Sequence, residues 1–122
     1  MKFDPRVILT MGQSPEAYAA GMVEIFRAGM NEGMSRHEIF QHIRDIIIKI
    51  QATKYDRRLE LEVKNCVTPC EFIITTYFLI FNMAYGTLEQ YKDGQRILEK
   101  VKAIAPDFVG EKECLAFAYK PL

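Results

Sequence analysis

Along this 122-residue chain, apolar residues recur three and four positions apart, which places them on one face of an α-helix. The first such segment is expected to run from about Pro15 to Met30. Ser14 precedes it, and its hydroxyl can accept a hydrogen bond from an amide of the first turn, while the ring of Pro15 already fixes a helical φ. Gly33 is expected to end this helix. These signals predict the first of four main helices.

The second segment carries the clearest start signal in the chain. Ser35 and Glu38 have the spacing of a capping box, in which each side chain accepts a hydrogen bond from the backbone amide of the other residue. A helix is therefore expected from Arg36 to about Ala52. One of its faces is a continuous apolar stripe, made of Ile39, Ile43, Ile46, Ile47 and Ile50.

A similar capping pattern opens the third predicted helix at Pro69. Thr68 and Glu71 form the box, and Val67 is expected to pack on Phe72 as a hydrophobic staple. The run that starts at Phe72 is apolar nearly all round, a pattern typical of a helix that is covered on every side. We therefore expect this helix at the centre of the fold or in a subunit interface.

A fourth helix is indicated before Pro106, which ends it because proline cannot continue a helix. Ile97, Val101 and Ile104 are expected to form its buried face. Together the four segments predict an all-α protein, a helical bundle in which residues 1–122 make a single domain.

Two further segments fit a strand as well as a helix. Residues 58–66 alternate between apolar and polar side chains, and residues 114–119 pose the same choice. If both are strands, and if residues 6–11 form a third, the chain becomes an α+β protein with a small sheet covered by helical hairpins. This alternative stays open at the level of the sequence.

Composition limits the class of partner. Sixteen basic residues balance sixteen acidic ones, so the chain as a whole has no field to attract a polyanion, and nucleic-acid binding is not expected. The longest apolar run, from Phe72 to Tyr85, is shorter than the roughly 20 residues that span a bilayer, so no membrane partner is expected.

No secretory signal is visible, and an odd number of cysteines suits reduced thiols. We therefore expect a cytoplasmic protein.

The strongest candidate for covalent chemistry is Cys70. It falls in the first turn of the third predicted helix, where free backbone amides and the helix dipole lower a thiol pKa. Paired with Cys66, it suggests a thiol-dependent or small-molecule-binding enzyme as the first alternative function. The spacing of the two is wider than in the C-x-x-C redox motif, and buried cysteines that only pack are common.

Metal binding and cofactors are not expected. His37 and His42 lie five positions apart on one helix, about 140° around its axis, so they cannot share a metal. Cys114 is far from both in sequence, and no cluster of ligand types forms.

A helix-turn-helix regulator is the second alternative function. The second predicted helix follows a short turn that contains glycine, and it carries Arg44 and Lys49. Its exposed face, however, has few of the side chains that read base edges.

The sequence contains no P-loop, dinucleotide fingerprint or nucleophile elbow. We therefore expect a non-enzymatic protein-interaction module, such as an adaptor, a small chaperone or an inhibitor-type partner, that acts through a helical surface on another protein. The extensive apolar faces of the second and third helices also predict a homodimer. The expected interaction surface contains Met34, Arg44, Lys49, Tyr77 and Tyr91.

Overall fold

The computed structural model describes residues 14–50, 64–81 and 88–110, without the side chains of residues 48–50, 79, 80 and 90. These residues form the helices α1 (Pro15–Asn31), α2 (Arg36–Ile50), α4 (Pro69–Phe81) and α5 (Leu88–Ile104), followed by the short 3-10 turn η2 (Pro106–Phe108). The prediction of an all-α fold is confirmed.

The alternative with a small sheet is not favoured, because the described part of the chain contains no strand. Of its three segments, residues 6–11 and 114–119 lie outside the described residues. The third is described only from residue 64 to residue 66, where the backbone passes from a helical residue into a turn.

The predicted helix starts at Ser14 and Ser35 are confirmed by their hydrogen bonds. The hydroxyl of Ser14 accepts from the amide of Ala17 at 3.1 Å. At the second helix the box is complete: the amide of Glu38 donates to the Ser35 hydroxyl at 3.1 Å, and the amide of Ser35 donates to the Glu38 carboxylate at 3.3 Å. Each helix therefore begins where its capping residue predicts.

The box before α4 differs from its prediction in one half. The amide of Glu71 donates to the Thr68 hydroxyl at 3.1 Å, as expected. The Glu71 carboxylate, however, accepts from the amide of Val67 at 2.8 Å, one residue earlier than a capping box requires. The Val67 side chain is 77% exposed, so the predicted staple on Phe72 is wrong: the chain enters α4 with this side chain directed outward.

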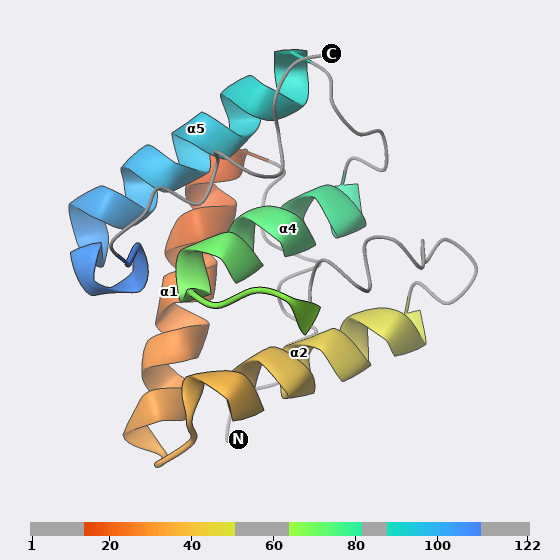
Figure 1. Cartoon of the computed structure of the whole chain (residues 1–122), viewed down its shortest axis with the longest axis vertical. Coiled ribbons are helices and arrows are strands. Elements are labelled where there is room, and N and C mark those ends of the chain that lie inside the picture. Colours follow the sequence, from red (N-terminus) through yellow and green to blue (C-terminus); the bar gives the residue numbers. More distant parts are fainter. Residues whose placement is uncertain (1–13, 51–63, 82–87, 111–122) are drawn as a thin grey trace.

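The helices pack so that α1 contacts α2, α4 and α5. Figure 1 shows α2, α4 and α5 one above another, with α1 crossing behind them. Helix α4 lies between the other two, and every side chain from Phe72 to Phe78 is buried. The central position predicted for this helix is thus confirmed.

Four phenylalanines join the elements of the core. Phe26 on α1 makes edge-to-face contacts with Phe40 on α2, Phe72 on α4 and Phe108 on η2, with ring centroids 5.6, 5.9 and 5.6 Å apart. Phe40 and Phe72 stack face to face at 4.6 Å with an angle of 6° between the ring planes. These contacts fix α2 against α4.

One residue of the predicted buried face of α5 is placed differently. Ile97 and Val101 are fully buried, whereas Ile104 is 42% exposed. The helix ends at this residue, and the turn that follows brings Ala105 and Phe108 into the core instead. The prediction for Ile104 is therefore wrong because the chain changes direction at Pro106.

Most of the described apolar stripe of α2 is covered within the single chain, although Ile46 is only half-buried. Ile39, Ile43 and Ile47 are no more than 1% exposed. The surplus of apolar surface from which a homodimer was predicted is therefore absent at these positions and along the buried part of α4.

Among the described residues, no helix has the length and apolar character that a membrane span requires.

A buried polar pair links α1 to α4. The hydroxyl oxygens of Tyr18 and Thr76 lie 2.8 Å apart, and both residues are completely buried. The Thr76 hydroxyl donates to the carbonyl of Phe72 at 2.8 Å, so it accepts from Tyr18. Burial raises the pKa of the Tyr18 hydroxyl well above its ordinary value, which keeps this group neutral and able to donate.

The two members of this pair are expected to be coupled, so that removing both costs less than the sum of the two single removals. Tyr18→Phe should lower the free energy of unfolding by about 1 kcal/mol, whereas Thr76→Val should lower it by roughly 1–3 kcal/mol because it leaves a buried hydroxyl without an acceptor. The double variant should lose less than the sum of the two. Urea unfolding of the four proteins measures these values, and simple additivity would contradict the assignment of the bond.

Candidate functional site

The residues predicted to form an interaction surface differ in their burial. Tyr77 is only 4% exposed and belongs to the core, while Met34 and Tyr91 are half-buried and pack against it. The side chain of Lys49 lies outside the described residues. Arg44, also of the predicted set, lines a pocket.

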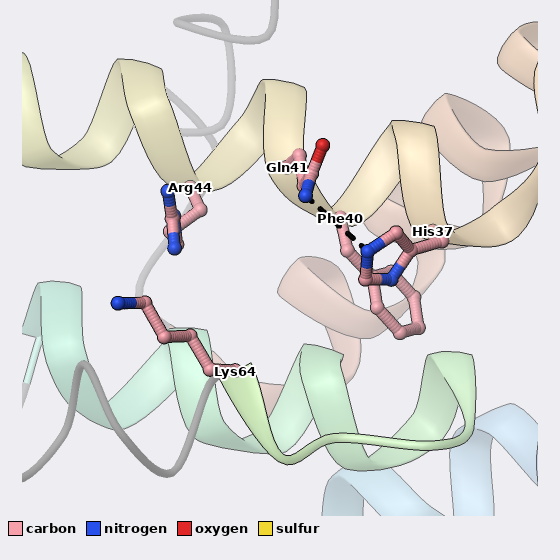
Figure 2. Close-up of a pocket in the computed structure, with 5 residues that line it drawn as sticks. All are labelled: His37, Phe40, Gln41, Arg44 and Lys64. Atoms are coloured by element: carbon pink, nitrogen blue, oxygen red, sulfur yellow. Dashed lines mark hydrogen bonds between the residues drawn. The ribbon is translucent and has the colours of Figure 1, made fainter.

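This pocket lies between α2 and the segment that leads into α4, and we call it the α2–α4 pocket. It has a volume of about 210 Å³. Figure 2 shows the side chains that line it, which are His37, Phe40, Gln41, Arg44 and Lys64. The Arg44 guanidinium and the Lys64 ammonium point into the same gap from its two sides.

The four α2 residues of the pocket follow from the helical period. Positions 37, 40, 41 and 44 have the spacing i, i+3, i+4 and i+7, which places them along one face of α2. Phe40 is 6% exposed and stacks on Phe72, so the core fixes the rotation of this face about the helix axis. The neighbouring positions are therefore held at the edge of the pocket.

Arg44 is only partly satisfied within the described structure. Its Nη2 donates to Asp45 at 3.2 Å, and its side chain is 23% exposed. Its Nε is buried, and no acceptor among the described residues lies within hydrogen-bonding distance of it. An unsatisfied buried N–H costs roughly 1–3 kcal/mol, so this atom favours the arrival of an acceptor.

His37 and Gln41 form the polar part of the other end of the pocket. The Nε2 of His37 and the Nε2 of Gln41 are 3.2 Å apart. When the imidazole is neutral with its proton on Nδ1, the Gln41 amide donates to it. The two residues thus bond each other, while Arg44 and Lys64 line the other end of the pocket (Figure 2).

A second hollow is a shallow groove of about 600 Å³ along α1 and α5, the α1–α5 groove. The arginine of this groove is paired within the chain. Arg96 donates from Nη2 to Glu16 at 2.7 Å and from Nε to the other carboxylate oxygen, and these bonds lower the pKa of the Glu16 carboxyl. Burial raises the pKa of Asp93, which lies 3.5 Å from Arg96. The groove therefore has both signs of charge, with its arginine already neutralised.

The cysteines predicted as catalytic candidates take different environments. Cys70 is 0% exposed and belongs to the core, while Cys66 is half-buried with its Sγ 3.7 Å from the Thr75 hydroxyl. Within the described residues, neither forms a disulfide. Cys114 lies outside the described residues, and within the described ranges no group of three or more His, Cys, Asp or Glu side chains is arranged to hold a metal ion.

The burial of Cys70 predicts a simple order of reactivity. In the folded protein, iodoacetamide should modify Cys66 well before Cys70, because a thiol without exposed surface is not accessible to the reagent. Cys66 and Cys70 lie in one tryptic peptide, residues 65–92, so fragmentation of this peptide by tandem mass spectrometry after brief alkylation measures the order. Alkylation in urea serves as the control in which both thiols react. Rapid modification of Cys70 in the folded state would support the thiol-enzyme alternative instead.

Comparisons of the chain with protein-family models, with curated proteins and with solved structures find no match.

Sequence reasoning found only part of this site. It selected Arg44 as a surface residue and considered His37 only as a metal ligand. The spacing of positions 37, 40, 41 and 44 is a signal that could have identified the α2 wall. Lys64 has no such signal, because it comes from a segment that is separate in sequence from α2.

Proposed function

We propose that this protein is a non-enzymatic interaction module that binds an anionic group of a partner protein in the α2–α4 pocket. The observation that supports it most is the approach of two cationic side chains, Arg44 and Lys64, in a pocket where the lining residues that the structure describes include no acid. An anionic partner group is the natural complement of such a site.

The size of the pocket favours a protein partner over a cofactor. Pockets for cofactors and drug-sized molecules usually measure roughly 300–1,000 Å³, whereas this pocket measures about 210 Å³. One side chain or one chain terminus fits such a volume. Val67, which is 77% exposed three residues after Lys64, offers an apolar contact for the flanking part of a peptide.

The two alternative functions have less support. A thiol-dependent enzyme needs an accessible sulfur, and Cys70 is 0% exposed. A helix-turn-helix regulator needs basic side chains on the free face of its second helix, whereas Arg44 is directed toward the pocket and bonds Asp45.

A homodimer and a cytoplasmic location stay predictions of the sequence. The large apolar side chains that the described residues expose are Val67, Leu88 and Ile104.

The proposal is tested with short peptides of different charge. Acetylated and amidated fluorescent pentapeptides, in acidic, neutral and basic pools, are titrated with the protein, and binding is measured by fluorescence anisotropy. The acidic pool should bind best, and binding should weaken at high salt because the contact is ionic. Lys64→Gln and Arg44→Gln should each reduce the affinity several-fold.

The matched control is Lys92→Gln, which removes one positive charge from the α1–α5 groove and should leave peptide binding unchanged. A double-stranded DNA of mixed sequence is titrated in parallel. Equal binding of the three pools would contradict the proposal, and so would tighter binding of the DNA than of the acidic pool.

A further inference from the structure

The exposed face of α5 carries a charge pattern that is complementary to itself. We infer that a second copy of this chain docks along this face, with the two α5 helices antiparallel about a two-fold axis beside Gln95. This inference goes beyond the proposed function, because it concerns a surface separate from the α2–α4 pocket.

Helix α5 presents one face to the core and the opposite face outward. Ile97 and Val101 are fully buried, whereas Lys92, Glu99 and Ala103 are exposed. The exposed residues line the α1–α5 groove, a shallow hollow of about 600 Å³. Figure 1 shows α5 at one end of the stack that it forms with α4 and α2. An open groove along an outer helix is a suitable place for a helix of another molecule.

Four exposed residues of α5 lie close to one line along the helix. Leu88, Lys92, Glu99 and Ala103 are separated by four, seven and four positions, which keeps them within about 60° of one another around the helix axis. The outer two residues of this line are apolar, and the inner two have opposite charges. The pattern is therefore centred between residues 95 and 96, and it reads the same from both ends except that the charges exchange places.

An antiparallel pairing of two such lines brings unlike groups together. Lys92 of one copy lies opposite Glu99 of the other, and the two-fold axis repeats this pair, as an interface between identical surfaces requires. Leu88 of each copy lies opposite Ala103 of the other. A parallel pairing sets Lys92 against Lys92 and Glu99 against Glu99, and these like charges repel. The charges therefore favour a second copy in one orientation.

The charges on this line have little competition within the chain. Lys92 forms no salt bridge with another described residue, and the Glu99 side chain is 74% exposed, with its carboxylate 3.9 Å from the ammonium of Lys102. Arg96, which lies beside the axis, is instead held by both carboxylate oxygens of Glu16. Its charge is neutralised in each copy, so it does not oppose the approach of the other.

The composition of the face predicts a weak dimer that depends on concentration. Exposed ion pairs contribute little individually, and a pairing along one helix is smaller than a standard interface. Leu88 and Ala103 supply only a small apolar contact. This dimer differs from the one that the apolar faces of α2 and α4 predict, because those faces lie largely in the core of the single chain.

The test reverses the two charges separately and together. Lys92→Glu and Glu99→Lys each put like charges opposite one another on both sides of the axis, so each should weaken dimer formation roughly tenfold. An equimolar mixture of these two variants restores both unlike pairs and should form a heterodimer, and the double variant should dimerise again. Analytical ultracentrifugation at protein concentrations up to about 1 mM measures the mass against the 14.1 kDa of one chain.

The matched control is Arg36→Glu, which makes the same change of charge at an exposed position of α2 and should leave dimer formation unchanged. Circular dichroism verifies that each variant stays helical. A monomer at every concentration overturns the inference, and so does a dimer that neither reversal weakens, or a mixture of the two reversed variants that stays monomeric. The peptide titrations that test the α2–α4 pocket are independent of these results, so the proposed function stands or fails separately.

Discussion

The packing of Phe26 against three other aromatic rings is the interaction on which the rest of the structure depends. Its partners come from α2, α4 and η2, so one side chain of α1 sets the position of three other elements. Edge-to-face contacts have specific geometry, and a close-packed core transmits any change in them. The stack of Phe40 on Phe72 then fixes α2 against α4. The α2–α4 pocket is a direct consequence, because Phe40 belongs both to the core and to the pocket.

Local signals predicted the helices because capping acts between residues close in sequence. Ser35 and Glu38 satisfy each other as their spacing indicates, and the apolar run of α4 is buried as its composition indicates. The exposed side chains of Val67 and Ile104 could not be predicted in this way. Each depends on the direction that the chain takes beyond the end of a helix, which is set by tertiary packing.

The site was predicted less completely than the fold, for a related reason. A pocket needs residues from separate segments, and a helical period identifies only those on one helix. The spacing from His37 to Arg44 encodes one wall, while Lys64 reaches the pocket from a segment twenty residues further along the chain. Tyr77 illustrates the opposite error, because an aromatic residue chosen as a surface contact is 4% exposed. The proposed site therefore depends on long-range packing that sequence patterns do not record.

The central claim, that an anionic group of a partner occupies the α2–α4 pocket, is tested most directly by locating a bound acidic peptide. An isotope-filtered NOE spectrum of labelled protein with an unlabelled peptide reports which protein protons lie beside the methylene groups next to the peptide carboxylate. The account predicts contacts with the rings of Phe40 and His37. Contacts with Lys92 and Ala103 of the α1–α5 groove, and none with the two rings, would contradict it.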